Sequence, residues 1–183
     1  MKAGAVVALL CAVLLAGCSS SGSLASDVAD QLPDLTEQGF TSFECGDGDA
    51  IGESFQEPAE GDYVAQCWVG SPSGTYLDAV QLTHNKVLEE TGGVDLTASV
   101  CPADSLTAAG GIACRAAYIE RGGESVLVRT VVILAEPREV LADLPESPTQ
   151  EDILTALVGA KVEILVGTEP TTQGGTPAPS ATP

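Results

Sequence analysis

The stretch that decides the fold is Ile112–Leu134, IACRAAYIERGGESVLVRTVVIL. Two apolar runs, 112–121 and 124–134, flank the dipeptide Gly122-Gly123, and this arrangement is typical of a β-hairpin. The second run has Val, Leu or Ile at seven of its eleven positions and on both faces, so both faces should be buried. The stretch therefore predicts an antiparallel hairpin whose second strand is central in a sheet and is covered by helix on one side.

Further elements are predicted on the amino-terminal side of this hairpin. A helical stretch with apolar Val28, Leu32 and Leu35 begins after the N-cap Ser26, is interrupted or restarted at Pro33, and ends at Gly39. Residues 62–69 alternate, with Tyr63, Ala65, Cys67 and Val69 on one face, as in a strand. We also expect strands over 40–45, 75–83 and 93–101, a turn over 71–74 and a short helix over 85–91.

The same order of elements occurs twice in this reading. When the two segments are aligned so that Cys45 matches Cys101 and Cys67 matches Cys114, each copy has a Gly-centred hairpin after its second cysteine. The sequence therefore predicts two degenerate helix-strand-hairpin repeats, with boundaries at 25–84 and 85–135.

The carboxyl-terminal part adds one helix and one strand. Ser147 as N-cap and Pro148 at the first helical position indicate a helix start. Gly159 ends the helix, 161–166 forms a strand, and the Pro/Thr/Gly-rich 167–183 is a disordered tail. The apolar face of this helix consists of Ile153, Leu154, Leu157 and Val158. The fold class is α+β, with an antiparallel β-sheet, helices packed on one face and disulfide staples, in a domain over 25–166.

The first residues form a lipoprotein signal peptide. The apolar run 3–15 has thirteen residues, whereas a spanning helix needs about 20. It ends in Leu15-Ala16-Gly17-Cys18, which has the small residue before the cleavage point and the thiol after it that a bacterial lipobox requires. We expect removal of 1–17 by cleavage between Gly17 and Cys18, a diacylglyceryl group on Cys18 and a short tether over 18–24. The protein would then be held on the outer face of the cytoplasmic membrane.

Four cysteines remain after Cys18, and in an exported protein an even number indicates disulfides. Four cysteines allow three connectivities, of which we favour the local one, Cys45 with Cys67 and Cys101 with Cys114. Structural zinc sites place cysteines two to four residues apart, and these spacings are twenty-one and twelve residues. No metal is expected.

Charge is strongly unbalanced. The chain has 26 acidic and 7 basic residues, a formal net charge of −19, and twelve of the acids lie between 19 and 83, where there is no Lys or Arg. Such a surface repels phosphate backbones, so a nucleic-acid partner is excluded. The expected partner is an envelope or membrane protein with a basic surface.

Catalytic and metal motifs fail on inspection. The single histidine, His84, is expected at an exposed or edge position, and no nucleophile elbow, HExxH or phosphate loop accompanies it. Asp47, Asp49 and Glu53 lie in an acidic Gly-rich loop and are candidate ligands of a weak cation site. Ile51 and Pro58 stand where an EF-hand needs oxygen ligands, so the calcium motif is incomplete. No cofactor is expected.

Residues 91–134 resemble a known small protein domain. Val100-Cys101-Pro102, Leu106, Gly110-Gly111, Cys114 and Gly122-Gly123 are similar to a small two-cysteine domain of unknown function in short envelope lipoproteins of actinobacteria. The resemblance implies an extracytoplasmic module with a disulfide between Cys101 and Cys114 and no known catalysis.

These observations favour a non-catalytic interaction or accessory module of the cell envelope. The alternative is a carrier or sensor with a small apolar or cationic ligand between the 126–134 strand and the 153–158 helix. A hydrolase of unfamiliar type, which would need a cleft with converging carboxylates, is a weaker third hypothesis.

Overall fold

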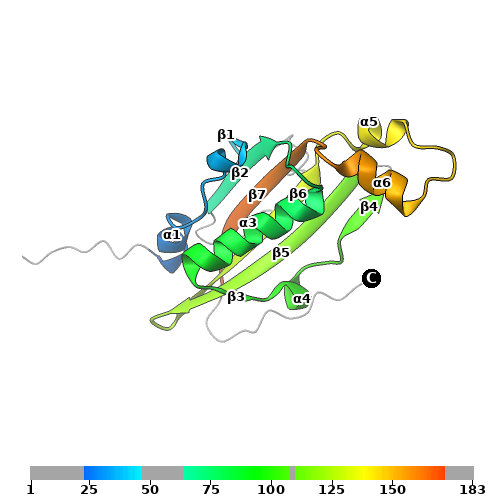
Figure 1. The fold of residues 1–183 in the computed structure, drawn as a ribbon. Coiled ribbons are helices and arrows are strands. Elements are labelled where there is room, and N and C mark those ends of the chain that lie inside the picture. Colours follow the sequence, from blue (N-terminus) through cyan, green and yellow to red (C-terminus); the bar gives the residue numbers. More distant parts are fainter. Residues whose placement is uncertain (1–22, 47–63, 108–109, 172–183) are drawn as a thin grey trace, which may run out of the picture.

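The computed structural model describes residues 23–46, 64–107 and 110–171. These residues form a seven-stranded antiparallel sheet in the order β1-β2-β7-β6-β5-β3, with β4 paired to β5 off this path, and helices on one face (Figure 1). The α+β prediction is therefore confirmed. The strands are β1 (Thr41–Phe43), β2 (Val64–Gly70), β3 (Val94–Asp95), β4 (Ser105–Thr107), β5 (Gly110–Arg121), β6 (Glu124–Leu134) and β7 (Val162–Pro170). The helices are α1 (Leu24–Ala29), η1 (Thr36–Gln38), α3 (Tyr76–Thr91), α4 (Thr97–Val100), α5 (Pro137–Ala142) and α6 (Gln150–Leu157).

The β5–β6 hairpin is the longest pairing in the sheet. Its ladder runs from Ile112 opposite Ile133 to Arg121 opposite Glu124. Gly122 and Gly123 have φ of 63° and 86°, as a type I′ two-residue turn requires. Because β7 pairs with the other side of β6, β6 is an interior strand buried on both faces, as predicted.

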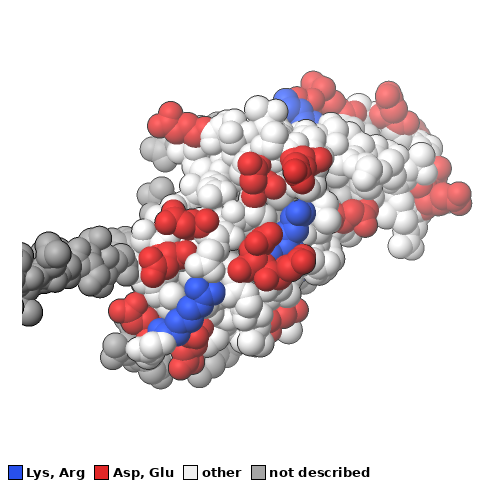
Figure 2. All heavy atoms as spheres, turned by 60° about the vertical axis from the view of Figure 1, so that its left-hand side comes forward, with Lys and Arg blue, Asp and Glu red and all other residues white. Residues whose placement is uncertain are grey.

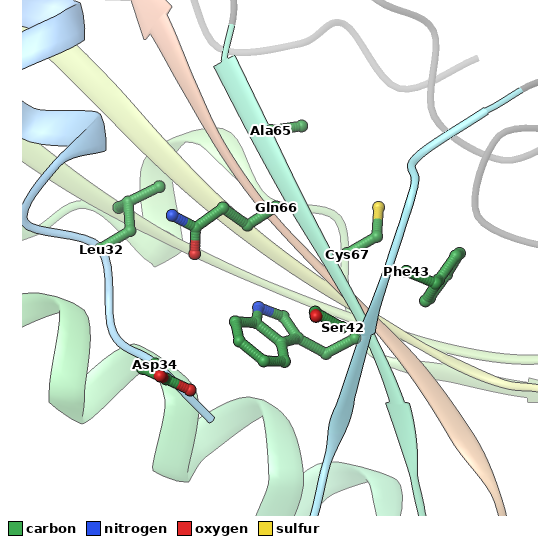
Figure 3. Close-up of a pocket in the computed structure, with 8 residues that line it drawn as sticks. Leu32, Asp34, Ser42, Phe43, Ala65, Gln66 and Cys67 are labelled. Carbon is green, nitrogen blue, oxygen red and sulfur yellow. The ribbon is translucent and has the colours of Figure 1, made fainter. Parts of the chain in front are cut away.

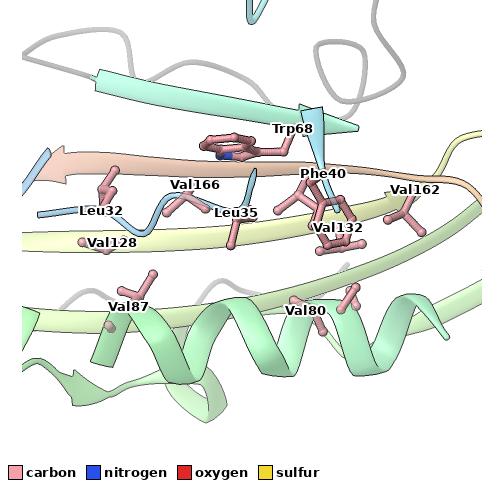
Figure 4. Packing of buried hydrophobic residues seen from close by; sticks show 14 of the residues in the cluster. Leu32, Leu35, Phe40, Trp68, Val80, Val87, Val128, Val132, Val162 and Val166 are labelled. Atoms are coloured by element: carbon pink, nitrogen blue, oxygen red, sulfur yellow. The ribbon is translucent and has the colours of Figure 1, made fainter. Parts of the chain in front are cut away.

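The core lies between the sheet and helix α3. Alternate residues of β6 point toward α3, which packs across β5 and β6, while α1 packs against β7, β6 and β2 (Figure 4). Burying each Val, Leu or Ile side chain contributes about 1.5–3 kcal/mol, so this layer is the main source of stability. Its fully buried members include Leu35, Val80, Val87, Val126, Val128, Val132, Val162, Ile164 and Val166.

A smaller apolar cluster lies on the opposite face of the sheet. Cys67, Val131, Ile133 and Leu165 are buried there, and Phe43, Cys45, Ala65 and Ile112 pack against them. The disulfide between Cys45 and Cys67 belongs to this cluster, and the one between Cys101 and Cys114 ties the end of α4 to β5. Both local pairings are confirmed.

Helix α3 corrects the largest error of the sequence prediction. The strand expected over 75–83 and the short helix over 85–91 form one sixteen-residue helix. Thr75 and Asp78 make a reciprocal capping box at its start, and buried residues follow at intervals of three and four, which is a helical period. The 71–74 turn therefore leads into a helix, so residues 64–83 do not form the hairpin that the predicted repeat requires there.

Two further predictions in this region are wrong in detail. Helix α1 begins at Leu24 with Ser23 as its N-cap, and not after Ser26. The strand expected over 93–101 is only β3, because the Asp95 carboxylate accepts the Thr97 backbone N–H at 2.9 Å and the chain turns there into α4. The Leu96 backbone N–H still donates to the Ala116 carbonyl at 2.8 Å, so this segment stays on the edge of β5.

The carboxyl-terminal boundaries also move. Helix α6 is capped by Thr149 in a capping box with Asp152, whereas Ser147 had been expected as its cap. Strand β7 runs past the predicted end at 166 to Pro170, because it pairs with β2 on one side and β6 on the other. Gly167 pairs with both neighbouring strands and Pro170 pairs with Val126 of β6, and this pairing overrides the low strand propensity of the two residues. The ordered domain thus includes residues that the sequence assigned to a tail.

Candidate binding pocket

A depression of about 380 Å³ lies at the edge of β2, where β1 ends beside it (Figure 3). Successive side chains of a strand point to opposite faces, so Gln66 and Trp68 belong to the helix-covered face and Ala65 and Cys67 to the other. The depression therefore wraps around the edge of the strand. Its lining is Leu32, Asp34, Ser42, Phe43, Ala65, Gln66, Cys67 and Trp68.

The edge of β2 is only partly covered. Strand β1 pairs with Cys67, Trp68 and Val69, so 64–66 have β7 on one side and no strand on the other within the described ranges. Continued pairing would place Cys45 diagonally to Cys67, about 7–8 Å away. The disulfide holds these two Cα atoms 5.3 Å apart, so the chain leaves the ladder after Phe43. Val64, at the open end of β2, is 37% exposed.

Trp68 is the most informative residue of the pocket. It is the sole tryptophan of the chain and is 7% exposed. Its indole Nε1 is buried and has no hydrogen-bond partner among the described residues. An unpaired buried donor costs about 1–3 kcal/mol, and a ligand that supplies an acceptor would recover this free energy.

Asp34 gives the pocket a negative charge. Its Oδ1 accepts hydrogen bonds from the hydroxyl and the backbone N–H of Thr36. These bonds stabilise the ionised form and lower the pKa of Asp34, so the carboxylate is charged at neutral pH. Both bonds use Oδ1, and Oδ2 has no partner among the described residues.

The pocket has the chemistry of a binding site. It offers an indole donor, an amide, a hydroxyl, a carboxylate and apolar walls, with no Lys or Arg in the lining. The lining holds no histidine that could activate Ser42, and Cys67 is in a disulfide. A fitting ligand would bring a hydrogen-bond acceptor to Trp68 and a cationic or donor group to Asp34.

His84 forms a second polar site, and its predicted exposed position is wrong. It lies within α3 and is 1% exposed, with Nε2 3.3 Å from Asp95 Oδ1. The approach is close, but neither ring nitrogen has a well-aligned hydrogen bond with a described residue. Burial lowers the pKa of His84, Asp95 opposes this shift, and Arg115 adds to it. The ring is therefore neutral at pH 7.

Arg115 lies on the same side of the sheet. Its guanidinium makes a bidentate ion pair with Asp104 at 2.7 and 2.9 Å and also contacts Gln81 of α3. Nearby, Tyr76 donates its hydroxyl to the Ser105 carbonyl at 3.1 Å. These side chains satisfy one another and hold the 101–107 segment to the sheet, which is a structural role.

The other predicted sites lie elsewhere. The lipidation and cleavage residues Cys18 and Gly17 and the candidate cation ligands Asp47, Asp49 and Glu53 fall outside the described residues. In the part of the chain that is described, no three His, Cys, Asp or Glu side chains are grouped as metal ligands would be. No helix there reaches the length and apolarity needed to cross a membrane. Helix α3 packs across β6, and the pocket described above lies at β2 and not between 126–134 and 153–158, where the sequence predicted a ligand.

Comparison with known proteins adds nothing to these residues: no protein-family model, curated protein or solved structure matches the chain.

The sequence could not identify this pocket. The alternating pattern over 62–69 predicts that Cys67 and Trp68 point to opposite faces of the strand. This was the only local pattern that concerned a residue of the pocket. The contribution of Leu32 and Asp34 depends on how the segment after α1 returns across β2. That path is set by tertiary packing.

Proposed function

We propose that the protein is a membrane-anchored extracytoplasmic lipoprotein that acts as a non-catalytic interaction module of the cell envelope. Its partner would carry a basic surface and bind at the β2 pocket. The observation that carries the proposal is the buried Trp68 indole, which has no hydrogen-bond partner among the described residues, in a pocket that the ionised Asp34 also lines and that has no Lys or Arg in its described lining. This combination supports recognition of a group that accepts a hydrogen bond and carries positive charge nearby.

The surface charge supports a basic partner. Figure 2 shows acidic side chains spread over the visible face, with few basic ones among them. Several of the cations are held within the domain, since Arg115 pairs with Asp104, Arg129 with Glu169 and Lys161 with Glu136. Most acidic side chains therefore keep an uncompensated charge, which attracts a basic partner and accelerates its association.

Photo-crosslinking in native membranes tests the proposal. A photoreactive amino acid replaces Ser42 in the pocket or, as the control, the exposed Glu90 on α3. The full chain is expressed with a tag in the bacterium that encodes it. We expect a defined basic envelope protein to crosslink at position 42 and not at position 90. Equal labelling at both positions, or none, contradicts the proposed site.

The anchor is tested separately. Cys18→Ser removes the thiol that would be acylated, so the protein should move from the membrane fraction to the soluble exported fraction. Mass spectrometry of the wild-type amino-terminal peptide should show Cys18 as the first residue with its lipid. An unmodified Cys18 preceded by the intact leader contradicts the proposed location.

A small-molecule carrier remains the second candidate because the pocket volume falls within the range of small-ligand sites. Native mass spectrometry of the purified full chain separates the two functions. A carrier retains a small molecule that is lost in Trp68→Phe, whereas an interaction module is purified without one.

A further inference from the structure

We infer that the partner is recognised as an extended segment that adds a strand to β2 at 64–66 and places a Lys or Arg side chain beside Asp34. The inference rests on the proposed function and specifies the chemistry of its partner. It joins three features, which are the open strand edge, the pocket that wraps around it and the acidic lining.

The open edge provides the backbone recognition. β2 is a seven-residue strand, and β1 covers only its second half. Strand addition uses such a row of unpaired N–H and C=O groups for affinity, and pockets for alternate side chains give specificity. Among the described residues, no strand pairs with 64–66 on this side, so these positions can accept an added strand.

The pocket provides the side-chain recognition. An extended segment beside β2 points alternate side chains to the two faces of the sheet. On the helix-covered face these side chains meet Gln66, Trp68 and Asp34, where a cation can pair with the carboxylate and a carbonyl can accept the indole N–H. On the other face they meet Ala65 and Phe43, which suit an apolar side chain. Basic residues alternating with apolar ones therefore fit the site.

Designed peptides test the inference with the full-length chain in detergent. The first probe is a seven-residue peptide of alternating Val and Lys. The second has the same sequence with alternate backbone amides N-methylated, and the third carries Glu in place of Lys. Because Trp68 is the sole tryptophan, its emission reports directly on occupancy of the pocket.

We expect the Val/Lys peptide to shift Trp68 emission and to protect the amides of 64–66 from hydrogen exchange. N-methylation should weaken binding by about tenfold or more because strand hydrogen bonds are lost, and the Glu peptide should not bind. Asp34→Asn should weaken binding by about fivefold, while the matched control Asp30→Asn, an exposed acid outside the lining, should change it by less than about twofold. Calorimetry with Trp68→Phe should show weaker binding, since the ring is kept and the donor is lost.

Each of four results would overturn the inference. Equal binding of the N-methylated peptide rules out strand addition. Protection of 64–66 equal to that of 67–69 in the free protein shows that the edge is already filled. A concentration-dependent dimer with the same Trp68 shift identifies a second copy as the occupant. If position 42 crosslinks a basic partner while every peptide fails, the inference fails and the proposed function stands.

Discussion

His84 shows how a single side chain can couple stability to pH. It is buried against β3 with Asp95 and Arg115 nearby, and burial lowers its pKa in the folded state below the ordinary value of 6.5. The unfolded chain therefore takes up a proton first as the pH falls. The stability that neutral His84 contributes is complete above pH 6.5 and is lost as the pH falls through the folded pKa.

The prediction for His84 is a melting temperature that declines as the pH falls below 6.5, measured by thermal unfolding in a series of buffers. His84→Leu should flatten this decline, because the titrating group is gone. Four carboxyl groups have pKa values that are lowered from 3.8, so their protonation reduces stability only at a pH well below the one at which His84 titrates. They belong to Asp34, Asp78, Asp95 and Asp152. Burial raises the pKa of Glu169, so protonation of this group favours the folded state as the pH falls, opposite to the effect of His84. The effect of Glu169 is the same in the wild type and in His84→Leu, so it does not alter the comparison. An unchanged slope in the variant contradicts the assignment.

At the scale of elements, the two capping boxes have unequal consequences. Thr75 caps α3, which covers the core, whereas Thr149 caps α6, where Leu154 and Val158 remain exposed. Thr75→Ala should lower the free energy of unfolding by about 1 kcal/mol, measured by urea denaturation followed by Trp68 emission. The matched variant Thr149→Ala should mainly speed amide exchange in α6. A larger global loss from Thr149→Ala contradicts this ranking.

The Cys101–Cys114 disulfide closes a loop with a sequence separation of 13. Replacing both cysteines by Ser should lower the free energy of unfolding by about 3 kcal/mol, the chain-entropy value for a loop of this size. Urea denaturation of the double variant measures the loss. Fluorescence from Trp68 is a suitable probe, because this residue lies on the far side of the sheet order from β5. A loss near zero contradicts the expected role as a staple.

The outcome for each element shows which signals a sequence carries. The β5–β6 hairpin was predictable because Gly122-Gly123 requires positive φ and both flanking runs are apolar. Helix α3 was misread because YLDAVQLT is a short apolar-rich run after a turn, which suits a strand as well as a buried helix, and the Thr75–Asp78 capping box favours the helix. The extent of β7 depended on two partner strands that are distant in the chain.

For the molecule as a whole, the excess of acidic groups dominates the electrostatics. With a formal net charge of −19, self-repulsion destabilises the compact state at low ionic strength. Raising NaCl from about 10 to 150 mM shortens the screening length from roughly 30 to 8 Å. We expect the melting temperature to rise by a few degrees in a scanning calorimeter. A fall would show that the Arg115, Arg129 and Lys161 pairs outweigh the repulsion.

Global features were predicted better than the site. Disulfide pairing, sheet class and charge follow from composition and local spacing, so the sequence alone supplied them. The pocket depends on Leu32, Ser42 and Gln66 meeting across distant segments, and no local pattern encodes that meeting. Sequence reasoning also placed His84 outside the core, because a lone histidine carries no periodic signal of its own.

The two ends of the ordered domain are fastened to neighbouring residues. The Leu24 backbone N–H donates to the Glu124 carboxylate, and the Thr171 N–H donates to the Ser125 carbonyl. The polypeptide therefore enters and leaves beside the turn of the β5–β6 hairpin, at the end of the sheet away from α5 and α6 (Figure 1). If Cys18 is acylated as proposed, that end of the sheet would lie nearest the membrane, and helices α5 and α6 would lie at the end away from it. The same proximity makes the domain a candidate for circular permutation, with a short linker joining its ends and new termini opened between α5 and α6.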